Sequence, residues 1–408
     1  MFKRWLHREG KEWVREGIIT KEQLTRILAR NPGPDRRMSW LPILAGILIG
    51  LGILSFIASN WEGIPPFLRL LILIGGMTGF YAAGEQCTRQ GFPHTGAVLT
   101  GLGVVTFGGG MVLVGQMYHL VAFDVRLFIL WGTAALISTF LYRHPVLFYL
   151  TFVILSAAQW YSTEEFRTFS YGTAMLFFAG LGWEAHRSEH RLHRWFVAAG
   201  VVHQSLLWVI GSEEEALWLF PFLMVLYTAG DWWHSRGWRR PLQTVSISAA
   251  FLMTLVVYYN PPGESGTFPS LPASLPYLTL TAGFLALSLR AKHRWGRLRE
   301  SDSWLLFLPF FYLTADGPQW LHQAVYLVVL YAASVGVLLR GSRRGSRFEA
   351  NWGILLFLVT TVNAYFNLAW DFMPKSLFFL LGGLLLFALN RFLQHRKNTR
   401  FSKGGDGR

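Results

Sequence analysis

Stretches of about 18–22 predominantly apolar residues recur along almost the whole of this 408-residue chain. Each is long enough to cross a hydrocarbon core of about 30 Å as an α-helix. Only 15% of the residues are charged, against roughly 25% in an average globular protein. The pattern predicts an all-α, polytopic transmembrane helical bundle of about 14 spans, at residues 40–60, 66–84, 95–115, 124–142, 144–161, 166–183, 194–210, 216–231, 241–259, 273–290, 302–315, 319–339, 351–370 and 374–391.

The distribution of Lys and Arg tests this division into spans. If the N-terminal segment lies in the cytoplasm and the chain crosses the membrane at every span, 33 of the 37 Lys and Arg residues fall on the cytoplasmic side. The exceptions are Arg69, Arg126, Arg167 and Lys375. Short cytoplasmic loops are enriched in Lys and Arg, and one missed or extra helix would reverse every later loop. The charges therefore predict an even number of spans, with both termini cytoplasmic.

Two of the predicted spans carry the weakest pattern. Span 144–161 follows its neighbour after only Arg143-His144-Pro145, and span 302–315 is short and contains Pro309. Loss of two adjacent helices would keep both termini on the same side of the membrane. Twelve spans are therefore the alternative to 14.

The spans also define the expected domains. We predict a cytoplasmic basic helical hairpin at 1–39, a transmembrane helical bundle at 40–391 and a disordered basic cytoplasmic tail at 392–408. In a soluble protein, the formal net charge of +14 would point to nucleic acid. Here the basic residues flank apolar spans, so we expect them to contact the anionic headgroups of the lipid bilayer, with no nucleic-acid partner.

The N-terminal segment is charged throughout and lacks the apolar core of about 7–15 residues that a signal peptide requires. Gly17 is placed to end a first helix, and Thr20 and Gln23 have the spacing of a capping box that opens a second. Two roles are open for this hairpin. Residues 1–30 bind a cytoplasmic protein partner, or the hairpin fixes the topology by resting its apolar side on the headgroups.

Signatures of enzymes and metal sites are missing from the sequence. It contains no Walker A loop, HExxH, CxxC or Gly-x-Ser-x-Gly motif. A single cysteine, Cys87, allows neither an intrachain disulfide nor a cysteine-based metal site. We therefore expect no catalytic residue, no cofactor and no metal. A membrane-embedded transferase that relies on scattered outer-loop residues stays open.

Polar residues gather at the predicted outward ends of the first, third and thirteenth spans. If these three helices adjoin, the side chains form one outward-facing pocket for substrate. The alternative is that they cap helices and form hydrogen bonds between helices. The residues are Asn60, Glu62, Gln116, His119, Asp124, Asn363, Asn367 and Asp371.

The middle of the predicted membrane region contains almost no ionisable residue. Only His203, beside Gln204, lies near the centre of a span, whereas Asp231 is placed at an inner end. Ionisable groups inside a membrane are costly and mark ion or proton paths, so the sequence speaks against a pump with buried carboxylates. His203 is either a switch or ligand, or a neutral imidazole hydrogen-bonded between helices.

The third span is rich in glycine. Close packing against its neighbours is the expected role, and a sliding element in a transport cycle is the alternative. The glycines are Gly101, Gly103, Gly108, Gly109, Gly110 and Gly115.

Several stretches resemble a family of predicted bacterial membrane proteins. They are Trp13-Val14-Arg15-Glu16-Gly17-Ile18-Ile19, Ala58-Ser59-Asn60-Trp61, and Gln116-Met117-Tyr118-His119 with Leu130-Trp131. Over about residues 1–160 the chain resembles the domain-of-unknown-function 2157 family. The resemblance implies a bacterial inner-membrane protein, and it supplies no activity or catalytic residue.

Three classes of function fit these features. We favour transport or flipping of a lipid-linked or small polar substrate through the outward-facing pocket. The alternatives are a membrane scaffold or sensor acting through the N-terminal hairpin, and a membrane-embedded transferase. The sequence specifies neither the substrate nor the oligomeric state.

Overall fold

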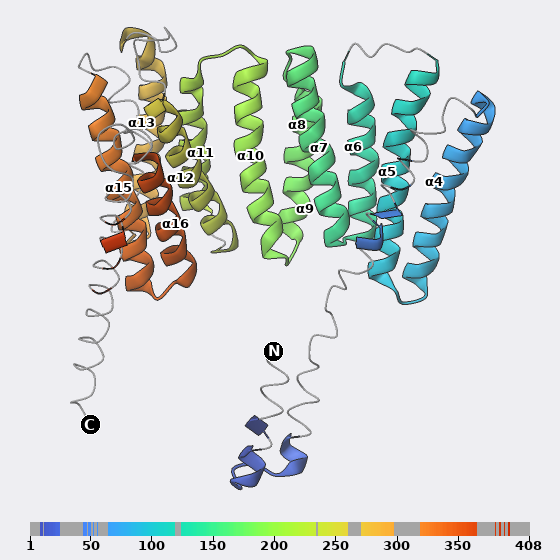
Figure 1. Ribbon diagram of the computed structural model, residues 1–408, viewed down its shortest axis with the longest axis horizontal. Helices are drawn as coiled ribbons and strands as arrows, with labels where there is room; N and C mark the ends of the chain where they lie inside the picture. Colours follow the sequence, from blue (N-terminus) through green and yellow to red (C-terminus); the bar gives the residue numbers. More distant parts are fainter. Residues whose placement is uncertain are drawn as a thin grey trace. The chain divides into compact units, whose positions relative to one another are not determined.

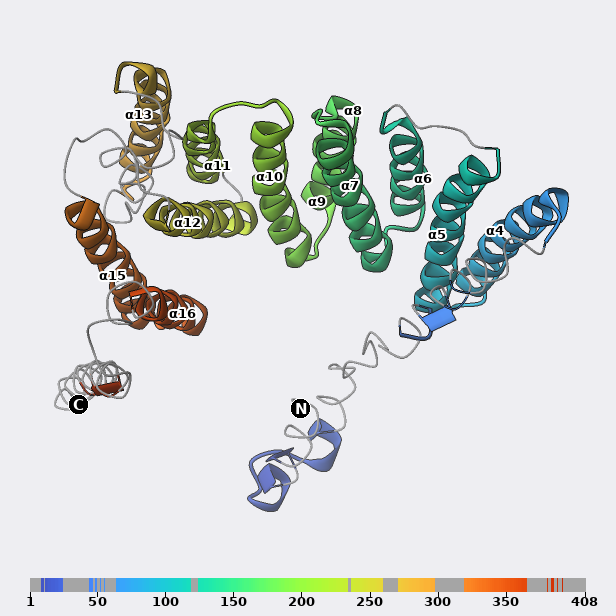
Figure 2. The ribbon, with the colours of Figure 1, turned by 45° about the horizontal axis from the view of Figure 1, so that its top comes forward.

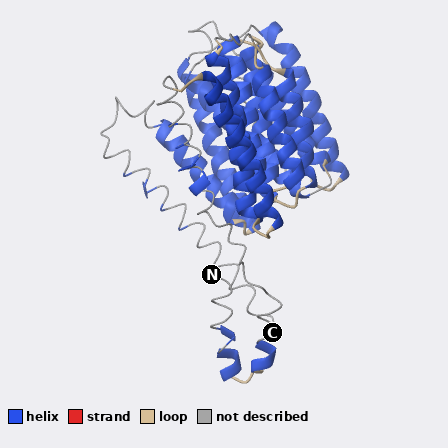
Figure 3. Cartoon of the chain, turned by 90° about the vertical axis from the view of Figure 1, so that its right-hand side faces the viewer, coloured by secondary structure: helices blue, strands red, loops and turns tan. Residues whose placement is uncertain are grey.

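The computed structural model describes residues 9–10, 12–24, 64–118, 124–233, 236–259, 271–297 and 319–364, with isolated positions at 44–55 and 380–391. All regular structure in these ranges is helical, and they contain no strand (Figure 3). This confirms the predicted all-α class. The chain divides into two compact units, unit 1 at Met1–His193 and unit 2 at Arg194–Arg408.

The described part of unit 1 from residue 64 onward is a series of helices (Figure 1). Proline at the first position starts three of them, where its missing N–H breaks no hydrogen bond. The last helix contains a π-helical segment, η2, between α8 and α9. The elements are α4 (Pro66–Arg89), α5 (Pro93–Met117), α6 (Arg126–Tyr142), α7 (Pro145–Phe166), α8 (Tyr171–Met175), η2 (Leu176–Leu181) and α9 (Gly182–Arg187).

Helices α4 and α5 cross with their backbones in contact. A Cβ atom on Gly84 would lie 3.0 Å from the carbonyl oxygen of Gly96, and one on Gly96 would lie 2.7 Å from the carbonyl oxygen of Gly84. Farther along α5, a Cβ atom on Gly108 would overlap the ring of Trp131, whose Nε1 donates to the Val104 carbonyl at 2.8 Å. The close packing predicted for the glycines of this span is thus present at Gly108, whereas a Cβ atom on Gly115 would meet nothing within 4 Å. The approach at Gly84 and Gly96 was not predicted.

Unit 2 begins within α10, and its described residues form six further elements (Figure 2). Its core includes Leu223, Met224, Tyr227 and Ala250, all at most 3% exposed. The elements are α10 (Arg191–Gly211), η3 (Ala216–Trp218), α11 (Leu219–Trp232), α12 (Arg236–Tyr259), α13 (Leu271–Arg294), α15 (Gln319–Arg344) and α16 (Arg347–Ala364).

A second glycine crossing holds α15 against α16. A Cβ atom on Gly341 would lie 2.8 Å from the Cα atom of Ala350, and one on Gly353 would lie 2.7 Å from the Cα atom of Leu338. The turn between the two helices contains Gly345, which has a positive φ of 65°. Any larger side chain at Gly341 or Gly353 would have to separate the helices.

Four described helices are long and apolar enough to cross a membrane: Pro66–Arg89, Pro93–Met117, Pro145–Phe166 and Gln323–Arg343. Arg126–Tyr142 and Ala216–Trp232 are shorter apolar helices. The third of the four corresponds to the weakly predicted span 144–161, where Arg143 adopts φ 45° and lets α7 follow α6 directly. Span 302–315 lies wholly outside the described ranges, and only isolated positions of span 374–391 are described. The total of 14 spans and their orientation therefore stay predictions.

The capping box predicted in the N-terminal segment is present. The Thr20 N–H donates to Gln23 Oε1 at 2.9 Å, and the Gln23 N–H donates to Thr20 Oγ1 at 3.2 Å. Gly17 has a φ of 72°, in agreement with a helix end at this position. Leu24 is 8% exposed and packs against Gly10, so the two short helical segments contact each other.

Candidate functional site

Most of the predicted outward pocket lies outside the described residues. This applies to Asn60, Glu62, His119, Asn367 and Asp371. Gln116 is exposed in the last turn of α5, and Asn363 is buried in α16 of unit 2. Whether these residues share a pocket therefore stays a prediction.

Asp124 has a structural task at the start of α6. Its Oδ1 accepts the Arg126 N–H at 2.9 Å, and its Oδ2 lies 2.8 Å from Arg126 Nε. The side chains of Asp124 and Arg126 are 46% and 88% exposed. Val125 is the N-cap of α6 and has no side-chain capping bond, so Asp124 precedes the helix and contacts Arg126 through a turn bond and a surface ion pair. Whether Asp124 also lines a pocket stays a prediction.

Helix α10 carries His203 and Gln204, the polar residues predicted near the centre of a span. Gln204 is 2% exposed, whereas His203 is half-buried. Among the described residues, neither amide atom of Gln204 nor Nδ1 of His203 has a hydrogen-bond partner. The hydrogen bond expected for His203 is thus not seen at this atom, and the functional role predicted for the residue stays untested.

The most strongly buried charges in the described residues lie in unit 2, where α11, α12 and α13 meet. Asp231 is the penultimate residue of α11 and is 3% exposed. Lys292 lies in the last turn of α13 and is 1% exposed. Both α12 and α13 pack against α11, so the pair is enclosed by helices.

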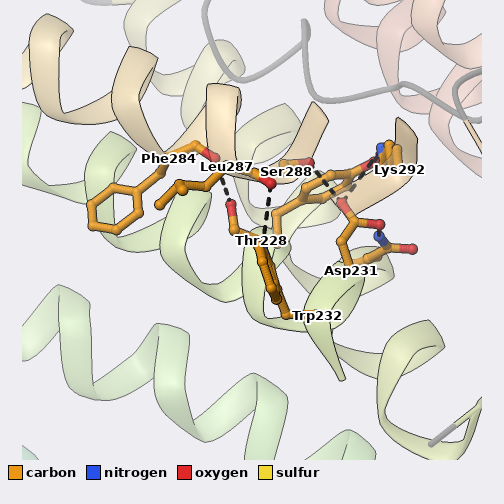
Figure 4. Close-up of polar contacts among 9 residues, drawn as sticks. Thr228, Asp231, Trp232, Phe284, Leu287, Ser288 and Lys292 are labelled. Atoms are coloured by element: carbon orange, nitrogen blue, oxygen red, sulfur yellow. Dashed lines mark hydrogen bonds and ion pairs between the residues drawn. The ribbon is translucent and has the colours of Figure 1, made fainter. Parts of the chain in front are cut away.

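Each charge has a close hydrogen-bond partner (Figure 4). Asp231 accepts from Gln243 Nε2 and from Ser288 Oγ, at 2.6 Å in both cases. Lys292 Nζ donates to the Tyr227 hydroxyl at 2.6 Å and lies 4.5 Å from the centroid of that ring. The ammonium and the carboxylate are 3.7 Å apart. We call these five residues the unit 2 ion-pair cluster.

Electrostatics make this cluster costly to disturb. Two opposite unit charges at this separation attract by roughly 4 kcal/mol at an effective dielectric constant of about 20. Removing both charges from water costs several kcal/mol per ion, and the attraction and the hydrogen bonds counter this cost only while both partners are present. If one partner is removed, the other stays buried without compensation. The pair is therefore stable only as a pair.

Two further side-chain contacts align α11 with α13. The Thr228 hydroxyl donates to the Phe284 carbonyl at 3.0 Å, and Trp232 Nε1 donates to the Leu287 carbonyl at 3.2 Å (Figure 4). On α11 the contact residues Thr228, Asp231 and Trp232 follow helical spacing and share one face. The cluster thus forms one end of a continuous polar seam between the two helices.

The cluster was not predicted from the sequence. Lys292 falls in a predicted cytoplasmic loop, whereas α13 continues to Arg294 and buries the side chain. Asp231 lies at the end of α11, near the predicted span end, but no partner was predicted for it. A signal was present: Tyr227 and Asp231, and likewise Ser288 and Lys292, are four residues apart and therefore share a helix face.

The comparison with known proteins gives a match in unit 1, at residues that do not include the ion-pair cluster. Residues 11–148 match the model of a family described as Predicted membrane protein (DUF2157). The predicted resemblance is confirmed over this segment. The family consists of predicted membrane proteins. The long apolar helices of this chain indicate the same class of protein. The unit 2 ion-pair cluster lies outside the matched residues.

No curated protein and no solved structure matches the chain. Among the described residues, no three His, Cys, Asp or Glu side chains are grouped so that they could hold a metal ion. Any functional inference must therefore come from the chemistry of the described side chains.

Proposed function

We propose that this chain is a multi-pass protein of the bacterial inner membrane that moves a small polar or lipid-linked substrate across the bilayer. In this proposal both termini are cytoplasmic, and the outer polar residues form the entry site. The supporting observation is the buried Asp231–Lys292 pair. Ionisable residues enclosed by membrane helices usually mark the path of a substrate or ion.

The geometry of the Asp231–Lys292 pair favours a contact between α11 and α13 that can separate, and not a rigid connection between the two helices. Lys292 and Asp231 are 3.7 Å apart, longer than a hydrogen bond, whereas each is 2.6 Å from a neutral partner. If α13 moved away from α11 with Ser288 and Lys292, Asp231 would keep its bond to Gln243. Lys292 would lose both Asp231 and the Tyr227 hydroxyl of α11, so a substrate anion would have to replace them as its partner.

The position of the pair suggests what it does in transport. Asp231 and Lys292 lie at the ends of α11 and α13 that the charge distribution assigns to the cytoplasmic side. We infer that the closed pair blocks the inner exit while substrate enters from outside. The ammonium of Lys292 then supplies the positive charge that an anionic headgroup or small anion needs inside the bilayer.

The test is reconstitution of the full chain into liposomes. One probe is a phospholipid with a fluorescent headgroup, whose translocation is followed by dithionite quenching. The second probe is a small encapsulated anionic dye. We expect the wild-type protein to translocate one probe, and the double variant Asp231→Asn/Lys292→Met to lose this activity while eluting normally in gel filtration.

Arg89→Gln is the matched control, because it alters an exposed ion pair in unit 1 and should leave translocation unchanged. Two outcomes would overturn the proposal. The wild-type protein translocates neither probe, or the folded double variant translocates as fast as wild type.

A scaffold or sensor acting through the N-terminal hairpin is the second candidate. The reciprocal capping bonds of Thr20 and Gln23 support it, because they favour a formed element over an unstructured basic tail. Ile18, at the turn, is 65% exposed and offers an apolar contact for a cytoplasmic protein. Deletion of residues 1–30 should then abolish function in cells without reducing the amount of protein in the membrane.

A further inference from the structure

Two histidines connect separate helical hairpins of unit 1. His94 is the second residue of α5, directly after the α4–α5 turn, and His144 is the N-cap of α7, in the α6–α7 turn. His144 Nε2 lies 2.8 Å from His94 Nδ1. The rings meet edge to face, with centroids 4.9 Å apart and an interplanar angle of 77°. Both side chains are half-buried.

A third contact fixes where the protons lie. His144 Nδ1 accepts the backbone N–H of Val146 at 3.3 Å, so this nitrogen carries no proton. In neutral His144 the proton must then be on Nε2, which donates to Nδ1 of His94. His94 in turn carries its own proton on Nε2. At neutral charge, one tautomer of each ring satisfies both hydrogen bonds.

One added proton breaks this arrangement. If His94 is protonated on Nδ1, two N–H donors face each other across the 2.8 Å contact. The contact is restored only if His144 moves its proton from Nε2 to Nδ1. Nδ1 can then no longer accept from Val146, and α7 loses its N-cap. Protonation therefore removes one of the two hydrogen bonds. We expect the Val146 bond to be lost, because a charge-assisted bond at 2.8 Å is stronger than a neutral bond at 3.3 Å.

The surroundings of His144 disfavour its charged form. Burial, together with His94 and His190, lowers the pKa of His144 from 6.5 to about 4. Phe148, one turn along α7, stacks on His193 with ring centroids 3.8 Å apart. Other titratable and charged groups at this end of unit 1 include Glu85, Cys87 and Arg89 on α4, Tyr142 and Arg143 at the α6–α7 turn, Glu184, His186 and Arg187 on α9, and Glu189 and Arg191 after it.

We propose that the His94–His144 pair is a pH-sensitive latch, which joins the start of α5 to the start of α7 near neutral pH and releases the N-cap of α7 on uptake of one proton. The direction of the pH dependence follows from the positions of the protons on the two rings. The neutral pair keeps both bonds, so the latch is closed near neutral pH and opens when the pair takes up a proton at lower pH. It does not depend on the transport proposal.

Hydrogen exchange of the full chain in lipid nanodiscs tests the latch. Exchange is read by mass spectrometry with residue-level fragmentation, at about pH 7.5 and about pH 5, after correction for intrinsic rates. We expect the Val146 amide to lose about tenfold in protection at the lower pH, as one lost hydrogen bond implies. The amides of Leu147 and Phe148 should change less, because they bond to the His144 carbonyl.

Two variants and a control separate the latch from general acid effects. His144→Asn keeps a side-chain oxygen that caps the helix without titrating, and His94→Gln removes the proton acceptor. Both should make Val146 protection independent of pH in this range. His203→Gln, on α10, should leave the wild-type response intact. A wild-type protein without the pH response, or a His94→Gln variant that retains it, would overturn the proposal.

A measurement on the unaltered protein covers the case in which a variant fails to fold. The ¹⁵N chemical shifts of the imidazole nitrogens report the tautomer of each histidine. We expect His144 to be unprotonated at Nδ1 at about pH 7.5. Protonation of this nitrogen at that pH would exclude the latch.

Discussion

The Glu85–Arg89 ion pair of unit 1 has a shorter distance between its charges than the Asp231–Lys292 pair of unit 2, but it is far less buried. Arg89 Nε lies 2.7 Å from Glu85 Oε1, and the two side chains are 74% and 42% exposed. Lys292 Nζ lies 3.7 Å from Asp231 Oδ2, and these side chains are 1% and 2% exposed. Distance alone would make the first pair the stronger one.

Burial reverses that order. Around Arg89 and Glu85 each charge stays hydrated, so loss of the partner is compensated by water. Around Lys292 and Asp231 water is excluded, and loss of either charge leaves the other in a medium that cannot solvate it. The contribution of an ion pair to the stability of this molecule therefore depends on whether water can solvate one charge when the other is removed.

The largest effect should follow from removing one charge of the buried pair. Lys292→Met leaves the Asp231 carboxylate buried with only Gln243 and Ser288 as partners. We expect the free energy of unfolding to fall by about 3–5 kcal/mol. Titration of the purified protein with SDS in mixed micelles, followed by tryptophan fluorescence, measures this change.

The double variant Asp231→Asn/Lys292→Met is the control for that result. It removes both charges and leaves an amide that still bonds to its neighbours. It should recover more than half of the lost stability, because no uncompensated charge is left. A Lys292→Met variant as stable as wild type would show that Asp231 is not an isolated charge in the folded state.

Much of the helical framework was predictable from the sequence. Apolar length gave α4, α5, α7 and α15, and the glycines of α5 indicated close packing. The start of α7 was also readable, because proline at the first helical position and Arg143-His144 before it form a short turn. These features depend on local sequence and on membrane thickness, which act over a few helical turns.

The candidate site was less predictable, because burial depends on packing between helices distant in sequence. Lys292 follows Arg290 and precedes Arg294, so composition alone places it in a basic loop. Only the packing of α13 against α11 brings its ammonium next to Tyr227 and Asp231. The latch was missed for the same reason, since His94 and His144 are 50 residues apart.

An intermediate effect should come from the hydrogen bonds that support the buried carboxylate. Ser288→Ala removes the hydroxyl that donates to Asp231 Oδ2, and we expect a loss of about 1.5–3 kcal/mol in the free energy of unfolding. Ser246→Ala is the matched control. Ser246 is also fully buried, but its hydroxyl donates at 2.7 Å to the Leu242 carbonyl of its own helix.

The control should lose less, because a bond to a neutral carbonyl that already accepts within the helix contributes less than one to a charge. The same SDS titration compares the two serine variants. Equal losses for Ser288→Ala and Ser246→Ala would mean that the carboxylate is already satisfied by its other partners.

The smallest effect should follow from breaking the exposed pair. In Arg89→Gln, Glu85 stays in contact with water and keeps the Tyr142 hydroxyl, which donates to its Oε2 at 2.9 Å. We therefore expect no measurable shift of the unfolding midpoint, and any small shift should vanish in high salt because exposed charges are screened. The measurement is the SDS titration of wild type and variant at low and high salt. A loss comparable to that of Lys292→Met would mean that distance, and not burial, sets the strength of ion pairs in this molecule.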